Sequence, residues 1–311
     1  MFVCQQRAQG KQREGVLVMK GQTVRWGIFL GTTALTVIVV MALLVFMAGS
    51  ALAITGNWVP DYDHPFVGLV VIYNEHGEFL WRGSGALINS TVVLTAGHVV
   101  DTAAGAASAR VYFQQDAGAH YDPSLGYDPS TGYPKWGGVT GHILCNYGFA
   151  DFAGFPNTRD VGLVILDEPV QLDEYGELPS AGLLDELGTK RGVKKPLFTV
   201  SGYGLSYNVE DHSALSDISY RSRLMAQSTL VNLTSALTDG YNLQTQGNGN
   251  GRGGTCSGDS GGPVFLGGPD SNLIVAVTSF GMNALCRGTD FAYRIDRQEV
   301  LDWIRSCCCG N

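Results

Sequence analysis

Short apolar runs, rather than long amphipathic stretches, alternate with polar residues along the chain after about residue 54. The runs are rich in Val, Ile, Leu, Phe and Tyr, and they are separated by Gly, Asn, Asp and Pro. This pattern is typical of an all-β protein, because short strands joined by turns have this composition. We expect strands over 66–73, 79–88, 91–100, 109–114 and 160–166, and a second set over 197–204, 223–233, 262–266, 273–281 and 290–295.

Two segments interrupt the strand pattern. Residues 115–138 are rich in Asp, Gly, Tyr and Pro, and we interpret them as a long surface loop. Their aspartates could hold a calcium ion, but the spacing of a known calcium loop is absent, so a solvated insertion is favoured. Residues 167–195 look like a connector with one short helix near "SAGLLDEL".

The last segment, 297–306, has a different period. Val300, Leu301 and Ile304 share one face at helical spacing, which predicts an amphipathic helix that docks on the body. Two β-rich halves, a connector and a final helix together suggest a double β-barrel. We place the first barrel at about 54–175, the second at about 190–295, and treat 54–311 as one domain.

The N-terminus has the pattern of an export signal. No charged residue occurs in 27–47, basic residues precede this run, and Ala51-Leu52-Ala53 follows it. We therefore expect translation to start at Met19, a leader over 1–53, and cleavage directly before Ile54. The apolar run is also long enough to cross a bilayer, so a retained membrane anchor is the alternative.

Composition and charge narrow the function. A net charge of -8 with no basic stripe argues against nucleic-acid binding, since such proteins neutralise phosphates with clustered Lys and Arg. Six of the seven cysteines follow the leader, and no pair has the CxxC spacing of a zinc site. In an exported protein, disulfides are the better expectation. We expect no metal and no organic cofactor.

The stretch "GTCSGDSGGPVF", residues 254–265, carries the strongest chemical signal. Ser260 lies between glycines, which allow a sharp bend and a close approach to a ligand. The N–H groups of Gly258 and Ser260 could point together at a developing oxyanion. A serine hydroxyl needs a base, and His98 in "LTAGHVV" is a candidate. The histidine in turn needs an acid, and Asp160 at the start of "DVGLVIL" is suited to that.

The segments "TAGH", "RDVGLVIL", "GDSGGP" and "TSFG" resemble the signature segments of the chymotrypsin-like (trypsin-fold) serine peptidases, in that family's order of His, Asp and Ser. The resemblance covers about 54–306, and "GDSGGP" is its most specific motif. It implies two antiparallel six-stranded β-barrels with a C-terminal α-helix and an active site between the barrels. It also implies a secreted, bacterial-type endopeptidase that cleaves proteins or peptides, and we expect a monomer that meets a membrane only if the leader is retained.

The resemblance assigns a role to each matching residue. Ser260 is the nucleophile, His98 the general base and then the acid, and Asp160 orients His98. Gly258 and Ser260 supply the oxyanion-hole N–H groups. The strip that hydrogen-bonds the substrate backbone is Ser279, Phe280 and Gly281. A catalytically silent binding protein on the same scaffold is the rival class, but such proteins usually lose a member of the triad, and here none is lost.

Asp259 precedes the nucleophile, and in the family this acid receives the new N-terminal amine of the mature chain. "ITGN", which begins at Ile54, resembles such a start, with Asn57 where a second glycine is usual. Because the expected signal cut falls directly before Ile54, we hypothesise that export and activation are one event.

The cysteines fit the family in part. Cys256 and Cys286 match the disulfide that braces the primary specificity pocket. The disulfide that usually flanks the catalytic histidine is absent, because Gly83 and Val99 occupy both of its positions. Cys145 has no family partner, and we hypothesise a bridge to one of Cys307, Cys308 or Cys309.

The next feature is the primary specificity pocket, which selects the substrate side chain. Gly254, followed by Thr255, matches the pocket floor and carries no charge, so we expect a preference for small or medium apolar residues. Asp290 and Phe291 match the far wall of the pocket. An inward Asp290 would restore a preference for basic residues, whereas an inward Phe291 would make the pocket shallow.

Overall fold

The computed structural model describes residues 55–117, 137–187, 192, 194–205, 222–247, 251–282, 286 and 288–308. All of them lie in the second of the two units into which the chain divides, Met1–Gly49 and Ser50–Asn311. The expected leader over 1–53, Ile54 and most of the loop expected over 115–138 lie outside the described residues, so those expectations stay predictions. In the described ranges, no helix is long and apolar enough to cross a membrane.

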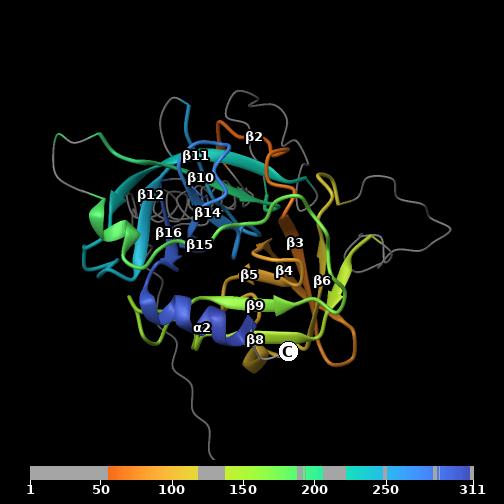
Figure 1. Ribbon diagram of the computed structural model, residues 1–311. Coiled ribbons are helices and arrows are strands. Elements are labelled where there is room, and N and C mark those ends of the chain that lie inside the picture. The colour runs from red at the N-terminus through yellow and green to blue at the C-terminus, as the bar shows by residue number, and fades with distance from the viewer. Residues whose placement is uncertain are drawn as a thin grey trace, which may run out of the picture. The chain divides into compact units, whose positions relative to one another are not determined.

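The first barrel is one antiparallel sheet in the order β7-β6-β3-β4-β5-β9-β8 (Figure 1). Its strands are β3 (Val67–Tyr73), β4 (Phe79–Leu87), β5 (Val92–Thr95), β6 (Ser108–Tyr112), β7 (Val139–Gly141), β8 (Ile143–Asn146) and β9 (Gly162–Ile165). His142 alone separates β7 from β8, so these two short strands are the halves of one strand bent at a corner. The corner joins the two edges of the sheet covalently, and the six strands form a nearly closed barrel.

The second barrel is a closed antiparallel sheet in the order β10-β14-β15-β16-β12-β11, with β10 also paired to β11. Its strands are β10 (Leu197–Gly202), β11 (Leu224–Asn232), β12 (Asn242–Gln246), β14 (Pro263–Leu266), β15 (Ile274–Gly281) and β16 (Thr289–Arg294). The short strand β2 (Val59–Pro60) pairs with the start of β11, at Leu224 and Met225. The expected pair of six-stranded barrels is therefore confirmed.

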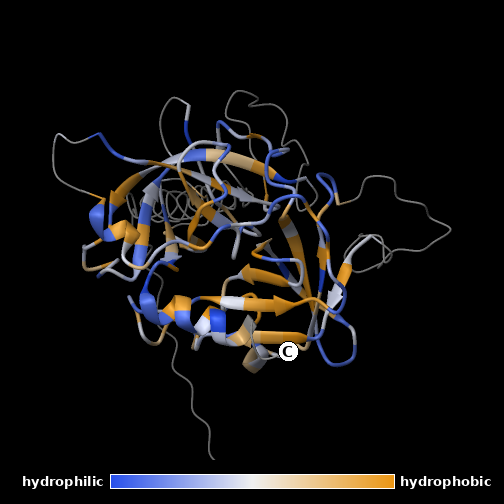
Figure 2. Cartoon of the chain, in the orientation of Figure 1, coloured by the Kyte–Doolittle hydropathy of each residue, from blue (hydrophilic) through white to orange (hydrophobic). Residues whose placement is uncertain are grey.

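Apolar residues concentrate on the strands and explain why the predicted runs became strands (Figure 2). In β3, every residue except Tyr73 is buried, because one face fills the barrel and the other is covered. A continuous apolar run is the signature of a strand buried on both faces. Burial of each large aliphatic side chain contributes roughly 1.5–3 kcal/mol, which makes these runs the main source of stability.

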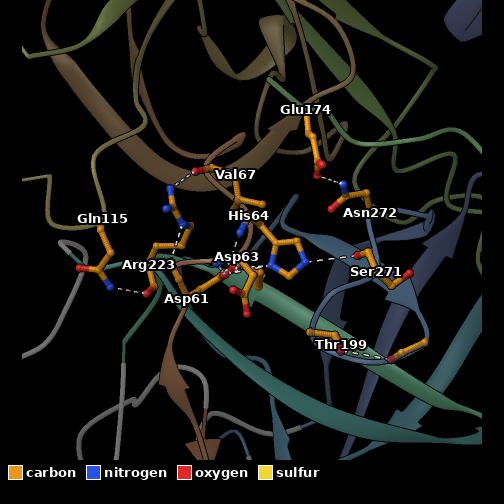
Figure 3. Close-up of polar contacts among 12 residues, drawn as sticks. Asp61, Asp63, His64, Val67, Gln115, Glu174, Thr199, Arg223, Ser271 and Asn272 are labelled. Carbon is orange, nitrogen blue, oxygen red and sulfur yellow. Dashed lines mark hydrogen bonds and ion pairs between the residues drawn. The ribbon is translucent and has the colours of Figure 1, made fainter. Parts of the chain in front are cut away.

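Arg223 ties the two barrels together. It lies directly before β11, is buried, and donates hydrogen bonds to the backbone oxygens of Asp61 and Val67 (Figure 3). It also donates to the backbone oxygen of Phe113. Val67 begins β3 of the first barrel, so one side chain from the second barrel satisfies backbone acceptors of the first. Hydrogen bonds to a charged donor are worth about 1.5–3 kcal/mol each. The seam between the barrels therefore combines these polar contacts with an apolar cluster that both barrels share.

A second set of contacts centres on the buried carboxylate of Asp61. It contacts the ring Nδ1 of His64 at 2.9 Å and accepts a hydrogen bond from Ser201. The other ring nitrogen of His64 lies 3.2 Å from the backbone oxygen of Ser271. Burial raises the pKa of Asp61, but the hydrogen bonds from His64 and Ser201 and the charge of Arg223 outweigh it and hold the pKa below its usual 3.8.

The C-terminal helix α2 (Gln298–Cys308) confirms the helix expected over 297–306. Val300, Leu301 and Ile304 are buried, as the helical spacing predicted. Trp303 lies 5.2 Å from Tyr147, ring centre to ring centre, so the helix packs against the residues that follow β8. Cys145 on β8 and Cys307 on α2 both pack against the same core cluster, and their hypothesised bridge stays a prediction.

Candidate active site

Asp160 holds both the ring and the backbone of His98. β5 and β9 pair antiparallel with Thr95 opposite Gly162, so the residues just beyond these strand ends meet. The ring Nδ1 of His98 lies 2.9 Å from Asp160 Oδ2, and the backbone N–H of His98 donates to Asp160 Oδ1 at 2.8 Å. Ser279 Oγ donates to Asp160 Oδ2 at 2.5 Å. Because Nδ1 of His98 is directed at the carboxylate, its other ring nitrogen, Nε2, remains available for proton transfer to or from another group.

The strand expected over 91–100 ends at Thr95, so His98 lies in a turn and not in a strand. The N–H of Val99 donates to the oxygen of Ala96, which closes this turn. Gly97 allows it, because a Cβ there would lie 2.8 Å from the Cβ of Phe149. The turn frees the imidazole from the pleat of the sheet and directs it to Asp160.

The electrostatic setting favours the charged form of His98. Burial alone would lower the pKa of His98, but the charge and hydrogen bond of Asp160, together with the charge of Asp101, raise it above its usual 6.5. The side chain of Asp160 is fully buried, whereas that of His98 is 26% exposed. A buried carboxylate against a reachable imidazole stabilises an imidazolium that forms when the ring takes up a proton.

Ser260 lies in a loop that the first barrel contacts closely. The backbone oxygen of Ser260 accepts from the N–H of Ser84 on β4 at 2.8 Å. The Oγ of Ser84 donates to the backbone oxygen of Gly258 at 2.9 Å. A Cβ on Gly261 would lie 2.6 Å from the backbone nitrogen of Ala96. The loop before β14 is therefore pressed against the end of β5, beside the turn that carries His98.

Two glycines let this loop adopt its conformation. Gly258 has φ 94° and Gly261 has φ 80°, a region that favours glycine over every residue with a Cβ. Among the described residues, neither the N–H of Gly258 nor that of Ser260 donates a hydrogen bond within the chain. Both donors are therefore available to a bound group, which is the condition that an oxyanion site requires.

Asp259, between these residues, points into the protein. Its Oδ1 accepts from the N–H of Gly204 at 2.9 Å and its Oδ2 from the N–H of Cys256 at 2.9 Å. The residue that was expected to pair with it, Ile54, lies outside the described residues. The next residue, Thr55, starts strand β1 (Thr55–Gly56), which pairs with β13 (Gly253–Gly254).

The residues expected at the specificity site gather at the ends of three strands. Gly254 ends β13, the strip 279–281 ends β15, and Gly281 pairs with Asp290 of β16. A disulfide joins Cys256 to Cys286, with Cα atoms 5.2 Å apart, as the resemblance implied. The N–H of Thr255 donates to Asp290 Oδ2 at 2.9 Å.

A row of phenylalanines that the sequence reading missed runs beside the site. Phe149 lies 5.8 Å from His98, ring centre to ring centre, and 5.1 Å from Phe152. Phe280 lies 5.6 Å from Phe152 and 5.9 Å from Phe155. The side chains of Phe152 and Phe155 are 37% and 43% exposed. The regular spacing of phenylalanines in "GFADFAGF" was the one available signal, but spacing alone does not place a loop.

The comparison with known families agrees with this arrangement. The family profile described as Trypsin matches residues 54–304. The chain belongs to the trypsin family. No curated protein sequence matches it.

Solved structures show the same fold as this trypsin-family chain. One titled "HL collagenase" is 20% identical with a TM-score of 0.55, over 78% of this chain and 93% of that one. Human heparin binding protein is 20% identical with a TM-score of 0.53, over 81% and 95%. At this identity, the likeness establishes the fold alone. Among the described residues, no group of three or more His, Cys, Asp or Glu could hold a metal ion.

Proposed function

We propose that this trypsin-family protein is a secreted serine endopeptidase that hydrolyses peptide bonds through an acyl-enzyme on Ser260. The observation that carries the proposal is the hydrogen-bonded pair of His98 and Asp160 beside the loop of Ser260. An aligned acid and imidazole next to a serine in a glycine-bounded turn is what nucleophilic catalysis by serine requires.

In the first half of the reaction, His98 Nε2 takes the proton from Ser260 Oγ while that oxygen attacks the carbonyl carbon of the substrate. The negative charge that develops on the carbonyl oxygen is stabilised by the N–H groups of Gly258 and Ser260. The protonated imidazole then gives its proton to the leaving amine as the C–N bond breaks. Ser260 remains as an ester with the acyl part of the substrate.

In the second half, water replaces the amine. The water oxygen attacks the ester carbonyl while His98 takes a proton from the water. His98 then gives this proton to Ser260 Oγ when the ester bond breaks. Asp160 keeps Nδ1 protonated and stabilises the imidazolium in both halves, and the hydrogen bond from Ser279 holds the carboxylate in place. No metal or organic cofactor takes part in these steps.

Activation is part of the proposal. The ammonium of a mature chain that begins at Ile54 would form an ion pair with the buried carboxylate of Asp259 and offset the cost of burying its charge. The pairing of Thr55 with Gly254 supports this, because β13 leads into the segment that carries Asp259. Cleavage of the leader would then release the protein and order the loop in one event. A membrane-tethered form remains the alternative if the leader is retained.

The test is covalent labelling of mature protein with a fluorophosphonate, followed by peptide mapping. We expect the label on Ser260, no label in Ser260→Ala, and parallel loss of hydrolysis of a casein substrate. Mature, folded protein that neither labels nor hydrolyses would instead favour the rival class, a binding protein on the same scaffold.

A further inference from the structure

The carboxylate of Asp290 fills the space that a side chain at Gly254 would use. A Cβ on Gly254 would lie 2.4 Å from Asp290 Oδ2, and the N–H of Thr255 donates to the same oxygen. Asp290 pairs with Gly281 on one side, so its carboxylate lies beside the strip expected to bind the substrate backbone. Position 254 carries no acid, but the carboxylate of Asp290 on β16 reaches the same place.

The neighbouring residue, Phe291, faces away from this place. Successive side chains of a strand point to opposite faces, so only one of the two can face Gly254. Phe291 is fully buried and stacks on Phe280, with ring centres 4.6 Å apart and an interplanar angle of 4°. Of the two outcomes left open by the sequence, the inward residue is Asp290.

No charged group of the described chain faces Asp290. Gly254 of β13 and Gly281 of β15 have no side chain, and Thr245, opposite on β12, carries no charge. Arg252, just before β13, donates to Thr229 instead. The Cys256–Cys286 disulfide does not titrate.

Arg294, on the strand of Asp290 itself, pairs with Asp185 and Asp296. Among the described residues, Asp290 has no ion pair of its own. Burial raises the pKa of Asp290 to about 7, although the hydrogen bonds from Thr255 oppose the rise. A nearly buried carboxylate beside which the described residues place no cation is a costly arrangement if it serves structure alone.

We propose that Asp290 is a specificity-determining residue that selects a lysine or arginine side chain immediately before the scissile bond. The inference rests on the proposed peptidase function. The cationic side chain would supply a partner that the described part of the chain does not place beside Asp290, and would pair with a carboxylate already held by Thr255. It replaces the expectation of small or medium apolar substrates, which was drawn from the sequence before the direction of Asp290 was known.

The carboxylate of Asp290 has a pKa of about 7, so the preference for a basic side chain should depend on pH. Above about pH 7 the carboxylate is ionised and attracts a cation, whereas at lower pH it is neutral and the preference is lost. Asp160 and Asp101 also raise the pKa of His98 above 6.5, but the protonation of His98 affects every substrate equally. The ratio of kcat/KM for two substrates therefore isolates Asp290.

The experiment compares two peptides that differ only in lysine or alanine before the scissile bond, with active sites counted by fluorophosphonate titration. In the wild type we expect the lysine-to-alanine ratio of kcat/KM to rise up to about tenfold between about pH 6 and pH 8.5. In Asp290→Asn we expect that ratio to fall about 10- to 100-fold at the higher pH, with alanine cleavage retained. Asp173→Asn, which removes an exposed acid in the connector, should leave the ratio unchanged.

A second readout needs no variant, in case Asp290→Asn does not fold. Butylamine should inhibit the wild type much more strongly than butanol at about pH 8.5, and the difference should vanish near pH 6. Labelled, active enzyme with no basic preference at any pH, or an unchanged ratio in a folded Asp290→Asn, overturns the inference and leaves the proposed function standing. Absence of both labelling and cleavage overturns both.

Discussion

Asp160 contacts His98 twice, with Oδ1 accepting from the backbone N–H and Oδ2 facing the ring Nδ1. The double contact fixes the position of the turn and the direction of the ring together. It also means that a substitution can remove the charge while the backbone contact survives. This separation makes the role of the carboxylate measurable.

The first prediction concerns Asp160→Asn. The amide keeps an acceptor for the backbone N–H of His98 but no longer stabilises a protonated Nδ1, so kcat should fall about 10⁴-fold with little change in Tm. Asp167→Asn is the matched control, because Asp167 contacts His142 on the surface in the same way, at 2.6 Å, and should leave kcat unchanged. Comparable loss in both variants would contradict the assignment.

The second prediction concerns the pH profile. Because the proposed general base is neutral His98, kcat/KM should fall as pH falls, with a midpoint above 6.5. Asp101 raises the pKa of His98 by its charge, so Asp101→Asn should move the midpoint of the pH profile down. Asparagine can still accept from the N–H of Ala103, as Asp101 does at the start of the short 3₁₀ helix η1 (Thr102–Ala104), so stability should hold. A midpoint that does not move, or moves upward, would refute the electrostatic link.

The third prediction concerns stability. Burial raises the pKa of Asp290 from 3.8 to about 7, so the native state binds a proton that the unfolded chain has lost. The free energy of unfolding should therefore fall as pH rises between these values, by at most about 4 kcal/mol. Asp290→Asn cannot ionise and should be more stable than the wild type at about pH 8, but not at about pH 4. Urea titrations at both pH values, with Asp173→Asn as control, measure the difference.

The fourth prediction concerns the missing disulfide beside His98. A Cβ on Gly83 would lie 2.8 Å from a γ-carbon of Val99, so the two positions are neighbours although neither is cysteine. The double variant Gly83→Cys, Val99→Cys should form a bridge and gain about 3 kcal/mol of stability. The same Cβ would lie 2.7 Å from the oxygen of Ser260, so we expect some loss of kcat. A thiol assay and Tm with and without reductant decide the outcome, and free thiols after oxidation would refute it.

The fifth prediction concerns the N-terminus. If the ammonium of Ile54 orders the loop around Asp259, one extra alanine before Ile54 should lower kcat roughly 100- to 1,000-fold, as loss of an oxyanion donor does. Ile54→Val keeps the amine in place and should retain activity. N-terminal sequencing of each preparation identifies the true start. A fully active enzyme that begins elsewhere would refute the coupling of export to activation.

Much of the fold follows from the apolar pattern. The strands with continuous apolar runs, such as β3 and β15, were predicted within a residue or two, because burial on both faces leaves a clear signal. β12 was missed because "NLQTQ" is polar and owes its strand conformation to pairing with β11 and β16. β1 and β13 are two residues each, too short for any periodicity.

Sequence motifs predicted the candidate residues that lie within them. Features of the site that depend on packing between strands could not be predicted. "TAGH" and "GDSGGP" identified His98 and Ser260 because the chemistry fixes the residues around them. The direction of Asp290 could not be read, since it depends on the register between β15 and β16. The influence of Asp101 on His98 was also missed, because nothing in the sequence reports the distance between two charges.

The seam that Arg223 forms has one further consequence. His98 and Asp160 lie on the first barrel and Ser260 on the second, so the groups proposed to react sit on two barrels joined by the contacts of Arg223 and by a shared apolar cluster. A slip of one body against the other by an ångström would separate the groups while both sheets kept their hydrogen bonds. On gentle heating or in dilute denaturant, peptidase activity should therefore disappear before circular dichroism detects any loss of β-structure.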